Sequence, residues 1–529
     1  MSKQRLFLLL AFLSLSFYNV KSGNAFYPEP TFFTQQDDYF LHTVERGQTV
    51  YSISVMYNVS VEDIYRLNPE SRKKIRAGEV LKIPQESGSY IYHTIRPQET
   101  LYSLAQQNHM KGEDIIAANP GLSVQTFTIG KIIRIPVNQV TTPMKGENEV
   151  VNSSRTNSLL SRTYPVEKVN VINIALLLPL GLNENTNVPN HPRSRMVEYY
   201  EGFLLALKEM KKMGISVDLQ TYDTGSETKE IPALLKKKEM QNINLLIGGF
   251  YDEQIKLLAR FAKEKNIPYV IPATSQSNEP LYNPNVYQVN TPQSALYSKA
   301  SLAFINKYGR DNIIIVSDET GTSNKKEFID LLKQDLQDRN IQYKTVTYGA
   351  NFYSNVKTLT NANQKNVVVP SDDSIETLTK ITAPLKGLVE NQPNISLSLF
   401  GYPTWQVYSA KFSTDFFRLN TTFYSAFYSD SSAPEVKTFN NTFYKWYTRV
   451  LETNFPKYGI FGYDTGMYFI QLINKYGSSF DSHINDIKYT GIQTDFNFER
   501  VNNWGGFTNM NMYLINYNSD FLITKTLVK

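Results

Sequence analysis

Residues 42–69 read HTVERGQTVYSISVMYNVSVEDIYRLNP, and residues 93–120 read HTIRPQETLYSLAQQNHMKGEDIIAANP. The two segments match at an offset of 51 residues, and further on LKIP at residues 81–84 pairs with IRIP at residues 133–136 after a slip of one residue. Self-similarity at a fixed period is the signature of a repeated structural unit. The chain therefore contains two copies of one small module.

Each copy predicts a strand, two short helices and a second strand. In the first copy, residues 40–44 alternate in hydrophobicity as a half-buried strand does. Thr49 can cap the first helix, and Ser60 followed by Asp63 resembles a capping box for the second. An Asn-Pro pair ends the second helix, because the residue before a proline disfavours helical geometry.

With this pattern, residues 39–86 and 90–138 resemble LysM modules, small α+β units of the order βααβ. The resemblance implies binding of glycans that contain N-acetylglucosamine, chiefly peptidoglycan, in a shallow groove between the loop after the first strand and the loop before the last. The implied glycan-binding residues are Gly47, Gln48, Thr49, Val50, Asn68, Pro69, Ile75, Arg76 and Ala77 in the first copy, and Gln98, Glu99, Thr100, Leu101, Asn119, Pro120, Thr128 and Ile129 in the second.

Two positions depart from the repeat, and one alternative stays open. Gln98 stands where the first copy has Gly47, and Lys111 replaces the capping Ser60. Thr49, Asn68 and Pro69 can also be read as caps and turn residues only.

Residues 1–25 have the pattern of a secretory signal peptide. Basic residues Lys3 and Arg5 precede the apolar run of residues 6–17, and Gly23 and Ala25 offer small side chains for a cleavage site. The run is short for a membrane span, although an uncleaved anchor is the alternative. We expect a mature chain without a transmembrane segment, secreted across the inner membrane and periplasmic or associated with the cell envelope.

Composition excludes several kinds of chemistry. The 529 residues include no Cys and only five His, so Cys nucleophiles, Cys-ligated metals and disulfides are excluded, and His-based catalysis is poorly supplied. The chain carries 54 basic and 49 acidic residues, and residues 1–25 hold three basic residues and no acidic one. The nearly neutral remainder gives no electrostatic reason to expect nucleic acid. We expect no catalytic residue, no metal and no cofactor.

The rest of the chain predicts a tether followed by a large α/β domain. Residues 139–168 lack periodicity and are rich in Ser, Thr and Asn, which is typical of a flexible linker. From residue 169 to residue 529 the hydrophobic pattern changes. Residues 171–178, VINIALLL, predict a buried parallel strand, and residues 199–213 predict an amphipathic helix. Further strands and helices alternate, which predicts a parallel sheet with helices on both faces.

The order of elements from INIALLLPL at residues 172–180 to FGYDTGMYF at residues 461–469 resembles a type I periplasmic binding protein of the leucine/isoleucine/valine-binding kind. The resemblance implies a bilobal fold with three crossings, one of them at residues 288–293, and a small ligand such as an amino acid between the lobes. The implied ligand-binding residues are Gly249, Phe250, Tyr251, Ala273, Thr274, Ser275, Thr320, Gly321, Gly401 and Tyr402.

Three features of the large domain qualify the small-ligand interpretation. The loop at residues 181–195 is long and polar, and Phe250 and Tyr251 are bulky where a small polar residue is usual. Asp223 could bind a ligand amine, but its position favours a turn or cap.

These observations favour a non-catalytic cell-envelope protein that binds peptidoglycan through two LysM modules and carries a receptor-like bilobal domain for a small polar ligand. Two alternatives stay open. The large domain can be a protein-binding regulator of cell-wall synthases or hydrolases, with an empty or plugged cleft, or the chain can be a cell-wall hydrolase. The expected partners are peptidoglycan and either a small polar ligand or a cell-wall enzyme.

Overall fold

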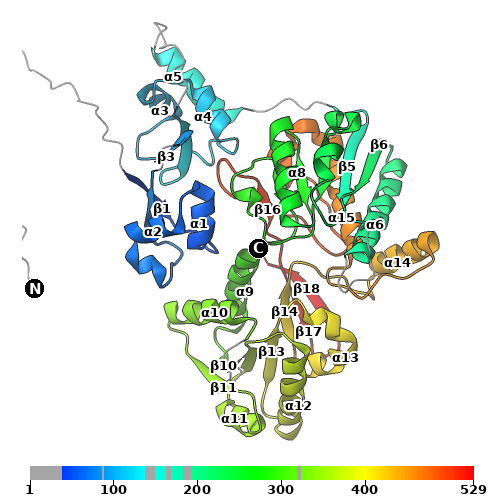
Figure 1. Ribbon diagram of the computed structural model, residues 1–529. Coiled ribbons are helices and arrows are strands. Elements are labelled where there is room, and N and C mark those ends of the chain that lie inside the picture. The colour runs from blue at the N-terminus through cyan, green and yellow to red at the C-terminus, as the bar shows by residue number, and fades with distance from the viewer. Residues whose placement is uncertain are drawn as a thin grey trace, which may run out of the picture. The chain divides into compact units, whose positions relative to one another are not determined.

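The computed structural model describes residues 38–85, 88–137, 149–162, 168–182, 192–317 and 323–528 (Figure 1). The segment expected to be a signal peptide lies outside these residues. In the described part of the chain, no helix is both long and apolar enough to cross a membrane.

The two repeats fold as two modules of the same βααβ order, as the sequence predicts. In the first, Tyr39–Thr43 (β1) pairs antiparallel with Val80–Pro84 (β2), and in the second Tyr90–Thr94 (β3) pairs antiparallel with Ile132–Pro136 (β4). The helices between the strands are Val50–Tyr57 (α1), Val61–Leu67 (α2) and the 3-10 turn Pro69–Arg72 (η1) in the first module, and Leu101–Gln107 (α3) and Gly112–Ala118 (α4) in the second. Each module buries an apolar core that its helices and its two-stranded sheet share.

Part of the stretch expected to be a flexible linker is helical. Glu149–Ser158 (α5) is followed by the 3-10 turn Leu159–Ser161 (η2), and Leu159 is buried in the core of the second module. The side chain of Asn157 accepts a hydrogen bond of 3.1 Å from the backbone N–H of Tyr102. These residues therefore extend the second module, which differs from the expectation of a tether through residues 139–168.

The large domain has two lobes, each built on one seven-stranded sheet. In lobe 1 the strand order is β15-β16-β9-β8-β7-β5-β6. Its strands are Ile172–Leu178 (β5), Val217–Asp223 (β6), Leu245–Gly248 (β7), Tyr269–Ile271 (β8), Val286–Gln288 (β9), Phe498–Arg500 (β15) and Phe507–Asn509 (β16). Its helices and 3-10 turns are Arg193–Lys212 (α6), Ile231–Leu235 (α7), Lys238–Asn242 (η3), Asp252–Lys265 (α8), Glu279–Leu281 (η4), Pro434–Tyr447 (α14), Tyr458–Tyr476 (α15) and Gly477–His483 (η5).

Lobe 2 repeats this design with the strand order β11-β10-β12-β13-β14-β17-β18. Its strands are Asn312–Ser317 (β10), Tyr343–Thr347 (β11), Asn366–Pro370 (β12), Leu397–Gly401 (β13), Thr422–Ser425 (β14), Tyr513–Tyr517 (β17) and Ile523–Leu527 (β18). Its helices are Gln293–Tyr308 (α9), Lys326–Asp338 (α10), Phe352–Leu359 (α11), Ile375–Asn391 (α12) and Trp405–Arg418 (α13).

Helices cover both faces of the lobe 1 sheet because successive side chains of a strand point to opposite faces. Along β5, Ile174 and Leu176 pack into the cluster that includes α6 and α15, whereas Ala175 and Leu177 pack into the cluster that includes α8. Helices α6 and α15 approach closely: a Cβ added to Gly202 would lie 1.7 Å from the carbonyl oxygen of Gly459. The FGYDTGMYF motif lies in α15 and continues this close approach, because a Cβ added to Gly462 would lie 2.0 Å from the carbonyl oxygen of Tyr199 on α6.

The chain crosses between the lobes at residues 289–292, 426–433 and 510–512, which confirms the bilobal fold with three crossings. The parallel strand β9 ends where the chain leaves for lobe 2, and the parallel strand β14 ends where the chain returns to lobe 1. The carboxyl ends of the parallel strands in both lobes therefore meet at the crossing region, which is where α/β folds place their ligand sites.

The LysM modules contact lobe 1 through the turn between β15 and β16. Trp504 in this turn is 2% exposed, and its ring centroid lies 5.9 Å from that of Tyr57 and 5.4 Å from that of Tyr92. The backbone N–H of Gly121 donates to the carbonyl oxygen of Asn503 at 2.8 Å. One tryptophan of lobe 1 thus packs against both modules.

Candidate functional site

The threonines expected in the glycan grooves are helix caps. The hydroxyl of Thr49 accepts a hydrogen bond of 3.0 Å from the backbone N–H of Ser52, and Thr100 accepts the same bond from Ser103. In both modules the serine hydroxyl in turn accepts from the threonine backbone N–H, which completes a capping box. These threonines stabilise the helices that support the groove.

The asparagines of the two Asn-Pro pairs tie a helix to the last strand of each module. The side-chain amide of Asn68 donates to the carbonyl oxygens of Ile64 and Lys82, and its oxygen accepts from the backbone N–H of Lys82 at 2.9 Å. Asn119 is fully buried and makes the matching three bonds with Ile115 and Arg134. We call these two side chains the asparagine clamps; their polar atoms are engaged within the module.

The remaining residues expected in the glycan grooves divide into core and surface positions. Val50 and Leu101 are buried core residues at 8% and 0% exposure, and Ile75 is half-buried against the first core. Gln48 and Glu99 each bind the module's histidine and a backbone N–H. The exposed members are Pro69, Arg76, Ala77, Gln98, Pro120, Thr128 and Ile129, while Gly47 is half-buried.

In the large domain, a cavity of about 620 Å³ opens at the carboxyl ends of β6 and β7. These two strands flank β5, which is the first strand of the domain, so the strand order reverses direction at this point. At such a switch point, the loops after neighbouring strands run in opposite directions, and a crevice opens between these loops. The lining residues are Ser226, Glu227, Thr228, Lys229, Tyr251, Asp252 and Glu253.

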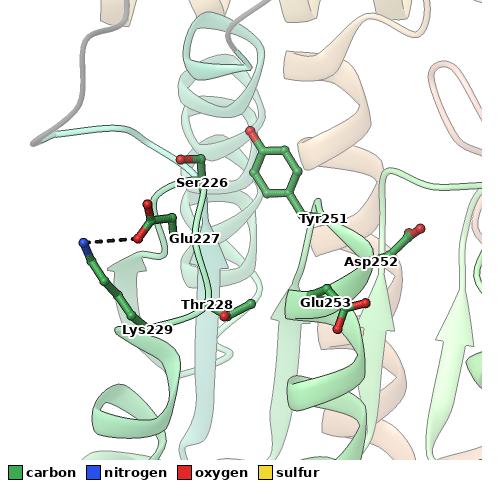
Figure 2. Close-up of a pocket in the computed structure, with 7 residues that line it drawn as sticks. All are labelled: Ser226, Glu227, Thr228, Lys229, Tyr251, Asp252 and Glu253. Atoms are coloured by element: carbon green, nitrogen blue, oxygen red, sulfur yellow. Dashed lines mark ion pairs between the residues drawn. The ribbon is translucent and has the colours of Figure 1, made fainter.

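Figure 2 shows Ser226–Lys229 on the loop after β6 and Tyr251–Glu253 on the turn into α8, with the cavity between them. Glu227 and Lys229 form an ion pair of 3.1 Å, whereas Asp252 and Glu253 stand in the first turn of α8. Glu253 in turn pairs with Lys256 at 2.6 Å, so two of the three carboxylates in the lining already have a lysine partner.

Two side chains outside the expected set hold the cavity wall in place. Gln254 is fully buried, and its amide donates to the carbonyl oxygens of Gly225 and Glu227, both at 2.9 Å, so it fixes the loop after β6 to α8. Asp223 accepts from the backbone N–H groups of Leu180, Gly181 and Leu182, which makes it a loop cap, as its position favours. Gln254 belongs to no sequence motif, so its role in holding the loop could not be predicted from the sequence.

The expected ligand residues of lobe 1 lie at this edge of the sheet. Gly249 has a φ of +78°, the left-handed region that glycine tolerates, and a Cβ there would lie 2.5 Å from the hydroxyl of Tyr269. Phe250 packs against the lobe 1 core with Arg195 over its ring at 5.9 Å, while Tyr251 lines the cavity. Ala273, Thr274 and Ser275 follow β8 and are half-buried.

In lobe 2, the described residues that were expected to bind the ligand have packing roles instead. Thr320 and Gly321 lie outside the described residues. A Cβ on Gly401 would lie 2.1 Å from the Trp405 ring, and Tyr402 is fully buried with its hydroxyl donating to the carbonyl oxygen of Pro370. Burial raises the pKa of Tyr402 well above its ordinary value. These two residues therefore serve packing in the lobe 2 core, and neither presents a polar atom to a ligand.

A polar network that sequence reasoning did not find lies after β12. Asp373, 6% exposed, pairs with Lys325 at 2.9 Å and accepts hydrogen bonds from Asn324 at 2.7 Å and Thr404 at 2.6 Å. The pair Asp372-Asp373 shows no partner in the sequence, because Lys325 and Thr404 are distant in the chain, directly before α10 and α13. Burial acts to raise the pKa of Asp372, but hydrogen bonds from Ser374 and Asn324 bring it below its usual value.

Among the side chains that the structure describes, no cluster of three or more His, Asp or Glu residues could hold a metal ion.

Comparisons with known proteins identify both halves of the chain. A family model described as periplasmic binding protein matches residues 196–520, and the LysM domain model matches residues 42–84 and 93–136. Both are families of binding modules. A curated protein of Bacillus subtilis (strain 168), named as a sporulation-specific glycosylase, YdhD, is 35% identical over 97 residues, which are 18% of this chain and 22% of that protein. The chain thus spans about a fifth of the length of this relative.

Solved structures of substrate-binding proteins resemble the large domain at low identity. A branched-chain amino acid transporter protein from Rhodospirillum rubrum is 12% identical, with 68% of this chain and 100% of that chain covered and a TM-score of 0.48. An ABC transporter substrate-binding protein from Desulfitobacterium hafniense, in complex with Leu, is 13% identical over 67% of this chain and 99% of that chain, with a TM-score of 0.40.

Proposed function

Because the chain belongs to the periplasmic binding protein family and also carries two LysM domains, we propose that it is a non-catalytic envelope protein that joins peptidoglycan to a receptor for a small polar ligand. The LysM pair binds the glycan, and the bilobal domain binds the ligand. Peptidoglycan lies outside the cytoplasm, so this function requires export to the periplasm or the cell envelope.

The cavity at the strand-order reversal of lobe 1 is the observation that carries the ligand proposal. It is an open depression with about 620 Å³ of accessible space, and it stands at the carboxyl ends of β6 and β7, where α/β folds place their ligand sites. Tyr251 supplies an aromatic wall, Ser226 and Thr228 supply hydroxyls, and Asp252 at the start of α8 supplies a carboxylate for a ligand that carries an amine. Amino acids and muropeptides both have this chemistry.

A thermal-shift screen with amino acids and muropeptides tests the receptor. A ligand at one hundred times its dissociation constant stabilises the protein by about 2.7 kcal/mol. The variant Tyr251→Ala should lose this stabilisation, whereas Tyr444→Ala, at a tyrosine that is 57% exposed on α14, should keep it. Equal shifts in both variants would place the ligand elsewhere.

Calorimetric titration of the full chain with an N-acetylglucosamine tetramer tests the glycan arm. Ile129 is 68% exposed in the loop before β4, so Ile129→Asp should leave the fold intact and weaken binding by the second module. Val124→Asp, at a residue that is 54% exposed outside the implied groove, is the matched control. Unchanged binding by Ile129→Asp would remove this residue from the site, and no binding by the wild type would refute the glycan proposal.

A protein-binding regulator is the second candidate, and the exposed side chains of one segment favour it. Tyr444, Trp446 and Val450 are 57%, 56% and 75% exposed, respectively, on and just after α14. Tyr444 and Trp446 are two positions apart on α14 and so lie on different faces of this helix, but each exposes an aromatic ring of the kind that protein contacts use. If the whole ligand panel gives no thermal shift, and Trp446→Ser abolishes retention of a cell-wall synthase or hydrolase on the immobilised protein, the regulator replaces the receptor.

The proposal includes no hydrolase activity. Incubation of the protein with purified sacculi should release no soluble sugar or peptide, and release of fragments would overturn the non-catalytic assignment.

A further inference from the structure

The first LysM module touches lobe 2 through one of the two loops that form its proposed glycan groove. Arg46, beside Gly47, donates from Nη1 to Oδ1 of Asp335 at 3.2 Å, and its Nη2 binds the other oxygen of this carboxylate. Nη2 also donates to the carbonyl oxygen of Ser298 at 3.3 Å. Two parallel bonds from one guanidinium to one carboxylate are a strong and directional form of ion pair.

The carboxylate that receives Arg46 belongs to the interior of lobe 2. The side chain of Asp335, on α10, is 7% exposed and also accepts a hydrogen bond of 2.5 Å from the hydroxyl of Ser301 on α9. A nearly buried carboxylate needs partners for its charge, and Arg46 supplies the only cationic side chain paired with it among the described residues. The contact is therefore more than a chance approach of two exposed charges.

The loop backbone also lies against α9. A Cβ built on Gly47 would come within 3.4 Å of the carbonyl oxygen of Ser294 and 3.6 Å of the Cα of Ala295. On the other side of the proposed groove, Nη1 of Arg76 lies 3.9 Å from the carboxylate of Asp338 on α10. Both loops of the first groove thus face lobe 2.

The second module does not share this arrangement. Its residue at the position of Arg46 is Pro97, which has no charge to offer, and Pro97 and Gln98 are exposed. Ile129, in the other loop of its groove, is 68% exposed. In the first module, the face that carries the proposed groove contacts lobe 2. In the second module, the matching face is exposed to solvent.

We propose that lobe 2 and glycan compete for the first LysM module, so that this module binds glycan only after its loop at residues 45–48 leaves α9 and α10. This inference rests on the proposed glycan function of the modules and adds its regulation. Because coupling between two binding events is reciprocal, glycan bound at the first module also releases lobe 2. The second module binds glycan in either arrangement.

Calorimetric titration of the full chain with an N-acetylglucosamine tetramer tests the competition through its stoichiometry. The wild type should bind one tetramer per chain. The variant Asp335→Asn, which changes lobe 2 and leaves the module intact, should bind two, with affinity at the first module raised at least about fivefold. Asp415→Asn removes another lobe 2 carboxylate, paired with Lys386 at 2.8 Å, and should behave as the wild type.

Because Asp335 is nearly buried, its replacement can disturb folding. A second variant, at an exposed residue, therefore tests the same contact. Ser294 is exposed at the start of α9, and Ser294→Trp should push the Gly47 loop away without touching the lobe 2 core. It should also bind two tetramers. Two sites in the wild type, or one site in both variants, would overturn the competition while leaving glycan binding in place. No binding in any form would refute the proposed function and the inference with it.

Discussion

The two LysM modules have the same backbone and caps but different loop chemistry. Gly47 and Gln98 occupy the same turn with φ of +86° and +69°, so the turn is kept even where the side chain is not a glycine. Gln48 in the first module is Glu99 in the second, and each binds its module's histidine at 2.7 Å. The comparison teaches that the repeated residues hold the fold, whereas the change from Arg46-Gly47 to Pro97-Gln98 alters the loop that contacts lobe 2 in the first module.

The largest expected effect is loss of the aromatic contact that both modules share. Trp504→Ala removes a ring that is 2% exposed and packs against Tyr57 of the first module and Tyr92 of the second. We expect the free energy of unfolding to fall by about 3–5 kcal/mol, as for other buried tryptophans. Urea titration of the full chain measures this loss.

Trp446→Ala is the matched control, because Trp446 is 56% exposed on α14. It should change the free energy of unfolding by less than about 0.5 kcal/mol. Equal losses in the two variants would show that Trp504 does not hold the modules to lobe 1.

The next effect concerns the histidine of the first module. His42 is 5% exposed, its Nδ1 lies 2.8 Å from the Tyr57 hydroxyl, and its Nε2 faces the Gln48 oxygen. Burial lowers the pKa of His42, against the raising effect of Gln48. The unfolded chain therefore binds this proton more tightly, so the first module should lose stability as the pH falls below about 6.5.

Gln48→Glu gives the first module the carboxylate of the second. A carboxylate beside the ring favours its charged form, so we expect the pKa of His42 to rise in this variant, which NMR titration of the ring protons measures. Acid should then destabilise the first module less than in the wild type. A pKa that stays unchanged would mean that burial alone sets the protonation of His42.

The smallest effect comes from the second helix of each module. Ser60 accepts a hydrogen bond of 3.0 Å from the backbone N–H of Asp63, whereas Lys111 has no side-chain oxygen to offer at the matching position. Ser60→Ala should lower the free energy of unfolding by about 1 kcal/mol, and Lys111→Ser should raise it by about 0.5–1 kcal/mol. Thermal unfolding monitored by circular dichroism gives the sign of each change, and equal signs would contradict the difference between the modules.

Much of the fold could be predicted because it depends on local patterns. The capping threonines, the Asn-Pro pairs and the alternation of strands with helices are all short-range signals, and each appears in the structure where the pattern places it. The helix α5 was missed because EVVNSSRTNS has few apolar residues. Thr156 packs in the space left by the absent side chain of Gly112, a contact that no periodicity reveals.

The candidate sites were harder to predict because their contacts join distant parts of the chain. Tyr402 follows a strand as a ligand residue would, yet its side chain turns into the lobe 2 core. Asp373 pairs with Lys325, which precedes α10, and Trp504 packs against Tyr57 across more than four hundred residues of sequence. Chain position indicates which edge of a sheet a residue occupies, but packing decides whether its side chain points inward or outward.

The asparagine clamps have a consequence for how such small modules hold together. Units of this size often depend on disulfides or bound metals, and this chain has no cysteine. Asn68 and Asn119 join the end of a helix to the last strand with three hydrogen bonds each, through an amide that neither gains nor loses electrons. The modules should therefore keep their shape under reducing and oxidising conditions alike, and in the presence of chelators.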